Sequence, residues 1–415
     1  MSSNQQVEAG TYPLSGITVV EYGDFISGPY CARLLADAGA RVIKVESPEG
    51  DEARRRGPFP SDTPDPNRSG LFMYLNANKQ GMTLDLNRPE AKEVLLDLLR
   101  DADVLVENNP PSVMKEMELD FPRLHTRFPR LIMTSVTPFG QTGPYQDYRG
   151  DDLIAMNMGG LAYATPGLPD HIEDPVKEPP LRPATYLSDF VAGLAGAVAT
   201  FFALFSRLRD GVGRHVDVSQ QEAVASMMLW DIAHHSYLGT SKKRFPTAMA
   251  GVEPNKYMPC KDGYVAIVAF SDDHWRKLVQ VMGDPDWAKT ELFDVSYSRA
   301  QYWDALGPMI LEWTMSHTGQ EICELAQAKG LPCFPAYEVA DTLESQQVAA
   351  RGSLVGVESG GDSWRMPGPP FRFSHLSLGQ MAPAPRLGQH TEKILKNDLG
   401  YDADVLARLR AQEAI

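Results

Sequence analysis

The sequence has little cysteine and no motif that would use it. The 415 residues include only four cysteines, which are widely spaced: Cys31, Cys260, Cys323 and Cys333. Neither a Cys-x-x-Cys pair nor histidines at ligand spacing accompany them, which argues against a disulfide framework and against a zinc site. We therefore expect four buried thiols and no bound metal.

Positive charge is also scarce, since 39 lysines and arginines face 54 aspartates and glutamates, for a net charge of -15. This balance argues against binding nucleic acid or anionic lipid through bulk charge, so an anionic ligand would need local basic sites. Residues 1–15 carry no signal-peptide pattern, and we find no uncharged run of the roughly 20 residues that cross a bilayer. We expect a cytoplasmic protein with no membrane partner.

The sequence does contain a regular alternation of apolar strands and amphipathic helices. Strands are predicted at 17–22, 41–45, 103–106, 130–135 and 216–218, and helices at 30–37, 89–100 and 403–411. The opening strand–turn–helix–strand is a βαβ unit, and its continuation predicts an α/β domain with a mostly parallel sheet. Ligands bind such sheets at the carboxyl ends of the strands.

A second, smaller α/β domain is predicted inside the first. We expect residues 1–220 and 332–415 to form the large domain, and residues 221–331 to form a linker helix and the small domain. The elements predicted there are a helix over 219–238, a strand over 263–269 and helices over 274–282, 298–315 and 319–328.

One carboxylate lies in an unusual place. Asp189 precedes sixteen uncharged residues, 190–205, which include Gly193 and Gly196 at i, i+3 spacing and predict a closely packed buried helix. The N-terminal end of such a helix favours a negative charge. Asp189 could therefore only cap the helix, or it could be a nucleophile held in a semi-apolar cleft.

A nucleotide site near the first turn is a further hypothesis. Gly23 and Gly28 do not have the G-x-G-x-x-G spacing of dinucleotide-binding proteins, which argues against an NAD enzyme. Another adenine nucleotide could still bind at the strand ends through basic side chains. The candidates for phosphate contacts are Arg54, Arg55, Arg56, Lys79 and Lys115. The alternative for the three arginines is a solvated loop.

Six segments spread along the chain, weak singly, form a specific set. They are 16–29, 34–46, 76–79 (Asn-Ala-Asn-Lys), 101–108, 187–193 (Leu-Ser-Asp-Phe-Val-Ala-Gly) and 211–217. With them the chain resembles the family III CoA-transferases, a group that includes formyl-CoA transferase, crotonobetainyl-CoA:carnitine CoA-transferase and alpha-methylacyl-CoA racemase.

The resemblance implies that Asp189 is a covalent carrier. In the family mechanism this aspartate attacks an acyl-CoA thioester, which gives a mixed anhydride and CoA thiolate. The thiolate then attacks the aspartyl carbonyl, and CoA passes from the aspartyl thioester to an acceptor carboxylic acid through a second anhydride. The implied substrates are an acyl-CoA and a free acid, with no tightly bound cofactor.

The resemblance also implies CoA contacts, which carry over unevenly. The matching positions are Lys79, Asn108, Lys115 and Arg149. The position after Val-Ile-Lys-Val-Glu, basic in some relatives, is Ser47, so we expect the phosphate contact to move to Arg54 or its neighbours.

The residues expected around the acyl group are apolar. A glutamine that some members place two residues before Gly-Pro is Ile26 here, which argues against oxalate or formate as substrate. With Phe25 and Met156 expected near the site, the sequence favours a larger, more apolar acid.

Two alternatives to a transferase remain. The racemase branch uses a histidine in a Gly-His-Asp segment, which reads Gly150-Asp151-Asp152 here, so one of the two acid/base groups is missing. The chain could also be a non-catalytic CoA-binding subunit of a hetero-oligomer.

The architecture that the family resemblance implies is a Rossmann-like large domain with a small α/β domain, in a homodimer of interlocked rings.

Overall fold

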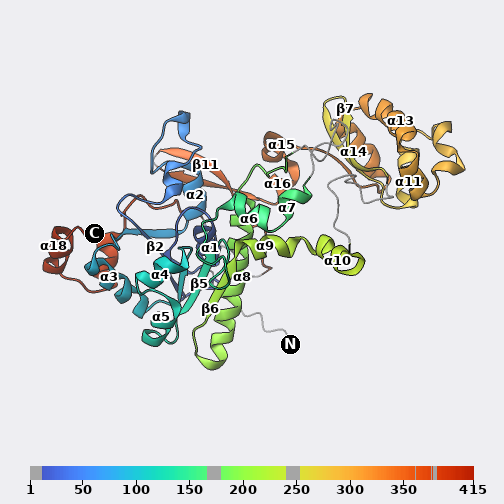
Figure 1. Ribbon diagram of the computed structural model, residues 1–415. Helices are drawn as coiled ribbons and strands as arrows, with labels where there is room; N and C mark the ends of the chain where they lie inside the picture. The colour runs from blue at the N-terminus through green and yellow to red at the C-terminus, as the bar shows by residue number, and fades with distance from the viewer. Residues whose placement is uncertain (1–11, 166–178, 240–252, 360, 375, 377–380) are drawn as a thin grey trace, which may run out of the picture. The chain divides into compact units, whose positions relative to one another are not determined.

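The computed structural model describes residues 12–165, 179–239, 253–359, 361–374, 376 and 381–415. These residues divide into two compact units (Figure 1). The first unit contains the described residues of 1–163, 182–240 and 352–415, and the second those of 164–181 and 241–351.

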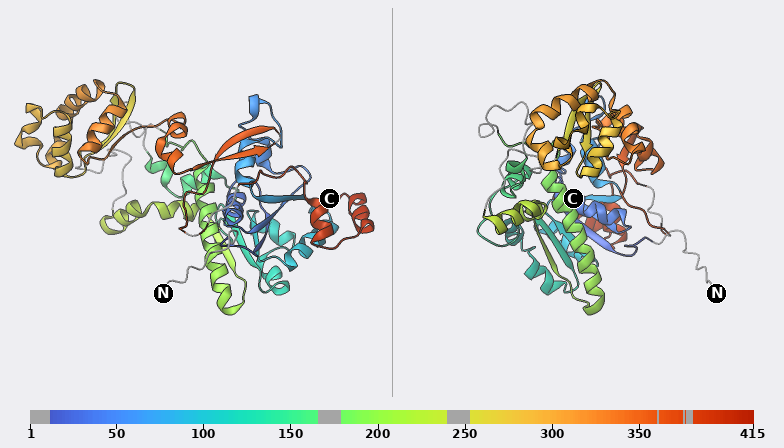
Figure 2. Two further views of the ribbon diagram at one scale, coloured as in Figure 1. Left: turned by 180° about the vertical axis from the view of Figure 1, so that it is seen from behind. Right: turned by 90° about the vertical axis from the view of Figure 1, so that its right-hand side faces the viewer.

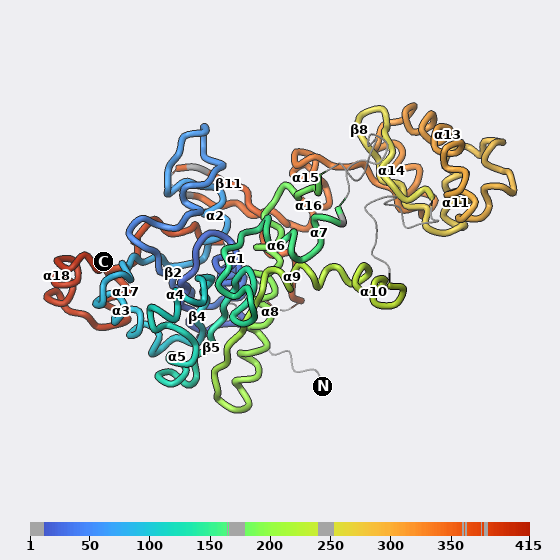
Figure 3. Tube along the Cα trace, in the orientation of Figure 1, coloured from blue at the N-terminus to red at the C-terminus, as the bar shows by residue number. Residues whose placement is uncertain are grey.

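A six-stranded parallel sheet forms the centre of the first unit (Figures 1 and 3). Its strands are β1 (Thr18–Tyr22), β2 (Arg41–Glu46), β3 (Lys79–Thr83), β4 (Val104–Glu107), β5 (Ile132–Thr137) and β6 (His215–Ser219). Their order in the sheet is β3-β2-β1-β4-β5-β6, with every neighbouring pair parallel. The order reverses between β1 and β4, and the crevice beyond the carboxyl ends of two such strands is where open α/β sheets bind ligands.

Alternating apolar residues attach helices to both faces of this sheet. Val19, Val42, Val104 and Ile132 belong to one buried cluster, which α1 (Ser27–Asp37) and α8 (Leu187–Asp210) complete. Their next neighbours along the strands, Val20, Ile43, Leu105 and Met133, belong to another, completed by α3 (Pro89–Arg100). Successive strand residues face opposite sides, so strands that are apolar at consecutive positions must be covered on both faces. The predicted α/β class with a parallel sheet is confirmed.

The remaining helices of the first unit are short. They are α2 (Gly70–Asn76), α4 (Pro111–Glu116), α5 (Phe121–Arg127), α6 (Asp152–Met158), α7 (Leu161–Ala164), α9 (Gln220–Met227) and α10 (Leu229–Leu238). The helix predicted over 219–238 is thus two helices, because Met228 leaves the helical conformation with φ -87° and ψ 27°. A hairpin of β10 (Leu354–Ser359) and β11 (Asp362–Pro367) packs on α2 through Val357, Met366 and Phe72 (Figure 2).

The C-terminal segment returns to the sheet of the first unit. The backbone N–H of His390 donates to the Gly81 carbonyl at 2.8 Å, and Gly81 donates to His390 Nδ1 at 3.1 Å. After this contact with β3, helices α17 (Thr391–Asn397) and α18 (Ala403–Ala411) pack in the same apolar cluster as α3.

Helix α8 lies close against α1, because a glycine faces it. A Cβ at Gly193 would lie only 2.7 Å from the Ser27 carbonyl oxygen, so a larger residue would push the helices apart. By length and composition α8 could also cross a membrane, and half of its most apolar stretch is buried. The core helix of a globular protein passes the same test, and α8 packs on α1, β5 and β6 as such a helix does.

The second unit is a three-stranded antiparallel sheet covered by helices. Its elements are β7 (Asn255–Cys260), β8 (Gly263–Val268), β9 (Cys333–Pro335), α11 (Asp272–Val281), α12 (Ser296–Gln301), α13 (Trp303–Met315), α14 (Gly319–Ala328), α15 (Val339–Glu344) and α16 (Gln346–Ala350). Because β9 pairs with β8, this unit continues past the predicted boundary at residue 331. Residues 221–239, predicted to belong to the small domain, group with the first unit, where α9 packs on α8.

Candidate active site

A cleft of about 550 Å³ lies at the carboxyl ends of the strands of the first unit. Segments that follow β1, β2, β4, β5 and β6 line it, together with the first turns of α6 and α8. The lining residues include Asp24, Phe25, Ser27, Glu52, Arg56, Asn108, Asn109, Pro138, Asp151, Asp152, Arg182, Tyr186, Asp189 and Gln220. The cleft therefore includes the reversal point between β1 and β4.

Asp189 is held in the first turn of α8 and is almost buried, with 7% of its surface exposed. Its Oδ1 accepts a hydrogen bond of 2.7 Å from Gln220 Nε2, and no side chain caps α8 at its N-cap residue, Tyr186. The Asp189 side chain therefore binds Gln220, and the N-cap position of α8 belongs to Tyr186.

The environment of Asp189 makes its carboxyl group less acidic than usual. Burial, followed by the charge of Asp152, raises the pKa of Asp189 to about 7, against opposing hydrogen bonds from Gln220 and Ser27. A carboxylate with such a pKa is a stronger base than ordinary aspartate and is still partly ionised near neutral pH. Strongly shifted groups in a cleft are typical of catalytic sites.

The two acidic residues at the start of α6 have separate tasks. Asp151 caps α6, because its Oδ1 accepts from the Ile154 N–H at 3.0 Å. Asp152 reaches across to α8, where its Oδ1 accepts from both the N–H and the hydroxyl of Ser188, each at 2.9 Å. Asp151 thus caps its own helix, whereas Asp152 joins α6 to α8.

The loop after β1 is clamped by Asn108, one of the predicted CoA-binding residues. Asn108 accepts from the Asp24 N–H at 2.8 Å, and its Nδ2 donates to the Asp24 carbonyl at 2.8 Å and to Ser27 Oγ at 3.0 Å. Between them Phe25 has φ of +62°, a strained conformation for a bulky residue. Such strain clusters at functional sites, where the surroundings enforce it.

Asp24 is a second carboxyl group in the cleft with altered acidity. Burial and the nearby charge of Asp51 raise the pKa of Asp24 to about 6, although the Glu52 N–H donates to its Oδ1 at 2.8 Å. With Asp189, the cleft holds two carboxyl groups that titrate above the usual range for aspartate.

Two arginines and two aromatic rings form another part of the cleft. Phe25 and Tyr186 meet edge to face with ring centroids 5.1 Å apart, and the guanidinium of Arg56 lies 6.0 Å from the first ring. The guanidinium of Arg182 lies 5.5 Å from the Tyr186 ring, and its Nη2 pairs with Asp152 Oδ2 at 3.2 Å. Both arginines are about half exposed, so each can also bind an anion in the cleft.

Arg54 and Lys79, predicted as phosphate ligands, lie inside the protein instead. Arg54 binds Glu46 with two nitrogens, at 2.6 Å and 2.8 Å, and is 1% exposed. Lys79 Nζ pairs with Glu21 at 2.6 Å and donates to two further oxygens. Moving Arg54 to a ligand would leave the buried Glu46 without its ion-pair partner, and moving Lys79 would take from the buried Glu21 one of its two cations, the other being Lys44 at 2.8 Å. This geometry does not support the predicted CoA contacts of Arg54 and Lys79.

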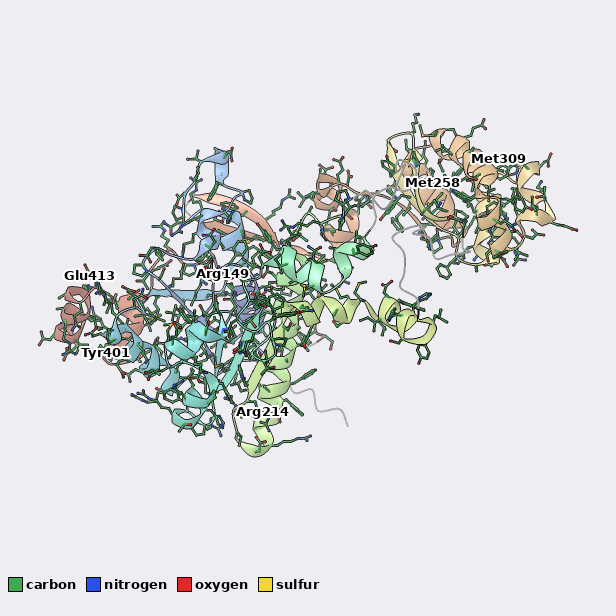
Figure 4. The ribbon with its side chains drawn as sticks, in the orientation of Figure 1. Arg149, Arg214, Met258, Met309, Tyr401 and Glu413 are labelled. Carbon is green, nitrogen blue, oxygen red and sulfur yellow. The ribbon has the colours of Figure 1, made fainter. Side chains whose placement is uncertain are left out.

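The other predicted residues are divided between the cleft and its surroundings. Phe25 and Asn108 line the cleft, whereas Ile26 and Met156 are fully buried and do not. Exposed positions outside the described lining are occupied by Ser47, Lys115 and Arg149, the last of which is labelled in Figure 4. The apolar acyl site expected from Phe25, Ile26 and Met156 therefore has one of its three members at the cleft surface.

Sequence reasoning missed several residues of the cleft. Arg182, Tyr186 and Gln220 belong to no motif, and Ser27 was not singled out within segment 16–29. Gln220 lies two residues after the predicted strand over 216–218, at the end where ligands bind. That position was the one available signal for Gln220. Among the residues that the structure describes, no group of three or more His, Cys, Asp or Glu side chains could hold a metal ion.

Comparison with known proteins agrees with this geometry. The description of CoA-transferase family III matches residues 14–391. The chain is 33% identical to succinyl-CoA–D-citramalate CoA-transferase of Chloroflexus aurantiacus, over 97% of this chain and 98% of that protein. It is 32% identical to the beta subunit of succinyl-CoA–L-malate CoA-transferase of the same organism, over 98% of each chain.

A solved structure is similar over nearly the same length. The crystal structure of a CaiB/BaiF family protein from Brucella suis superposes with a TM-score of 0.81 at 30% identity, covering 92% of this chain and 98% of that one. The family and the relatives are named as CoA-transferases, in agreement with the resemblance found in the sequence. The expectation that the chain is an enzyme is confirmed. The chain belongs to CoA-transferase family III.

Proposed function

We propose that Asp189 carries the acyl group and then CoA as covalent adducts. The observation that supports this most directly is a nearly buried carboxylate with a pKa of about 7, held by Gln220 at the ligand-binding edge of the sheet. One Asp189 oxygen attacks the thioester carbonyl, the C–S bond breaks, and CoA thiolate leaves with the electron pair. The product is a mixed anhydride between donor acid and Asp189.

The later steps return the aspartate to its starting form. The thiolate attacks Cγ of Asp189, the Cγ–O bond of the anhydride breaks, and the donor acid leaves as a carboxylate. The acceptor carboxylate then displaces CoA thiolate from the aspartyl thioester, and the thiolate takes the acceptor acyl group from the second anhydride. Because every step exchanges activated carbonyl bonds, the cycle needs no tightly bound cofactor. We also propose that the reaction takes place in the cytoplasm.

The substrates we propose are dicarboxylic acids, with succinyl-CoA as the first donor to test. Both relatives named above are called succinyl-CoA transferases acting on D-citramalate or L-malate. Within the cleft, Arg56 and Arg182 are cations that could bind a second carboxylate while the first reacts. A charge-assisted bond of this kind would favour a diacid over a monoacid of equal length.

Trapping the adduct tests the covalent role of Asp189. The wild-type enzyme is incubated with succinyl-CoA and hydroxylamine, and the peptide containing Asp189 is examined by mass spectrometry for a hydroxamate. Asp189→Ala should yield none and should lose CoA transfer, while CoA binding is retained. The control Asp210→Ala, at the exposed far end of α8, should behave as wild type. Transfer by a folded Asp189→Ala enzyme would remove Asp189 from the mechanism.

A second experiment separates transfer from racemisation. A chiral 2-methylacyl-CoA is incubated in deuterium oxide without an acceptor acid, and α-deuteration is followed by mass spectrometry. We expect none, because Asp151 caps α6 and Asp152 is bonded to Ser188 and Arg182, which leaves neither free as the second base. Rapid deuteration with loss of stereochemistry would withdraw the transferase proposal.

We also propose that two copies of the chain assemble, as interlocked rings in the arrangement that the family resemblance implies. One face of α8 presents a stripe of exposed apolar side chains: Leu194, Val198, Phe202, Phe205 and Leu208. Contiguous apolar surface of this kind marks protein interfaces.

Light scattering after size exclusion tests the assembly. The wild type should give the mass of two chains, and Phe202→Glu with Leu208→Glu should reduce it to one. Leu325→Glu, at an exposed leucine of the second unit, is the matched control and should leave the mass unchanged. A monomeric wild type at micromolar concentration would contradict the proposal.

A further inference from the structure

Gln220 is placed by rigid elements on both sides. It is the first residue of α9 and directly follows β6, whose last residue, Ser219, pairs with Thr137 of β5 and caps α9 through the Glu222 N–H. Its side chain is 4% exposed and lines the cleft. A residue held in this way has little freedom to move its amide group away from Asp189.

The amide of Gln220 distinguishes the two oxygens of Asp189. Nε2 donates to Oδ1 at 2.7 Å, a short bond to a carboxylate. The reversed amide would place Oε1 against the same oxygen, where two partial negative charges repel, so an ionised Asp189 fixes the observed orientation. We assign the attack on a thioester to Oδ2, the oxygen that Gln220 does not contact.

The other end of the amide has no partner among the residues that the structure describes. Gln220 Oε1 is buried and accepts no hydrogen bond from any described residue. An unpaired buried oxygen costs free energy, so a purely structural glutamine would ordinarily have this atom paired. In the cleft, an N–H or O–H group of a bound substrate can supply the missing donor.

We propose that Gln220 is a second catalytic residue, whose amide stabilises negative charge on Asp189 Oδ1 while the aspartyl carbonyl is attacked. This rests on the covalent role of Asp189 proposed above. When CoA thiolate adds to Cγ, a C–S bond forms and the carbonyl electron pair moves to Oδ1, which Gln220 Nε2 already contacts. The pair then returns, the Cγ–Oδ2 bond breaks, and the donor carboxylate leaves. A donor preset at the developing charge needs no reorganisation.

The two chemical steps should depend on Gln220 differently. In the first step the negative charge develops on the donor acyl oxygen, whereas in the second it develops on Oδ1. Removing the Nε2 donor should therefore slow the second step far more than the first. A loss of structure alone would slow both together.

Single-turnover kinetics measures the two steps separately. Free CoA thiol reports the first step, captured by a thiol reagent after rapid mixing with succinyl-CoA. Covalent CoA on the intact protein reports the second, detected by mass spectrometry. Gln220→Met should form the CoA adduct roughly 10²–10³-fold more slowly, the usual cost of losing one oxyanion donor, with thiol release changed less than tenfold.

Matched variants complete the experiment. Gln221→Met removes the amide one position further on, which donates instead to the Met158 carbonyl, and should match wild type in both steps. If Gln220→Met does not fold, Gln220→Leu also removes the donor without adding a charge and should give the same split. Equal slowing of both steps, or none, would overturn the role of Gln220 alone. Absence of any adduct on the wild type would overturn the covalent mechanism and Gln220's part in it.

Discussion

Asp152 and Ser188 are joined through a single carboxylate oxygen, which accepts from the Ser188 N–H and from its hydroxyl at 2.9 Å each. This contact ties α6 to the first turn of α8, one residue before Asp189. It also keeps a negative charge beside the proposed nucleophile, where it adds to the effect of burial on the pKa of Asp189. Asp152 therefore both holds the turn that carries Asp189 and raises the pKa of Asp189.

Neutralising Asp152 should shift the pH dependence of the reaction. The wild-type rate should rise with pH through about 7, as Asp189 ionises. Asp152→Asn keeps an oxygen for Ser188 but removes the charge, so the pKa of Asp189 should fall and the acidic limb of kcat/KM should move to lower pH. A series from pH 5 to 9 measures this. Asp151→Asn, whose charge contributes less, should shift the limb less; an upward shift in Asp152→Asn would contradict the assignment.

Replacing Asp189 should stabilise the free enzyme at high pH. The folded-state pKa of Asp189, about 7, lies above the ordinary value of 3.8, so folding favours the protonated form. The wild type should therefore lose stability as pH rises from about 4 to 7, whereas Asp189→Asn should not. Thermal unfolding at pH 5 and pH 8 checks this: the difference in Tm should favour Asp189→Asn and grow with pH. A difference that shrinks with pH would show that Asp189 is stabilised as an anion.

Removing Arg54 should destabilise the fold more than it weakens CoA binding. Arg54→Ala leaves Glu46 buried without its bidentate partner, which costs about 3–5 kcal/mol for a broken buried pair. Denaturant unfolding measures that loss, and Arg55→Ala, at an exposed neighbour, should cost little. The sequence-based prediction differs. If Arg54 bound a phosphate of CoA, Arg54→Ala would raise the Kd of CoA more than the Kd of a pantetheine analogue without the nucleotide.

Arg182 should govern the choice between diacids and monoacids. Arg182→Gln should raise KM for succinate as acceptor roughly 10-fold or more, by loss of one charge-assisted bond, while butyrate should change little. Arg214→Gln is a close control, because Arg214 is also a partly exposed arginine paired with an aspartate, Asp210, in the same unit. Figure 4 labels Arg214 near the far end of α8. Equal losses for both acids would assign Arg182 only to holding Asp152.

The sheet was predictable because its signal is local. Consecutive apolar residues such as Val19 and Val20 require cover on both faces, and helices α3, α14 and α18 begin and end where the sequence predicts. The cleft was less predictable than the sheet, because contacts between residues far apart in the sequence create it. Asp189 and Gln220 are 31 positions apart, and neither has a pattern that indicates the other.

Arg54 is the reverse case: the sequence predicts it as a ligand-binding residue, but the structure buries it. Three arginines in a row suggest an exposed basic patch, and Arg55 and Arg56 are indeed exposed. Arg54 turns inward because Glu46, at the end of β2, and the ring of Phe72, 3.6 Å from its guanidinium, form a place for it. Charge can be read from a sequence, but burial depends on which groups the fold brings opposite.

Gly193 has a consequence for the chemistry, although it touches no substrate. It lies one helical turn after Asp189, at the point where the Ser27 backbone approaches α8 too closely for a methyl group. Ser27 begins α1, and its hydroxyl is one of the groups that lower the pKa of Asp189. The absence of a Cβ at Gly193 thus sets how closely Ser27 approaches α8 beside Asp189, the proposed nucleophile. Gly193→Ala would therefore push α1 and α8 apart and widen the cleft, although it changes none of the residues that line the cleft.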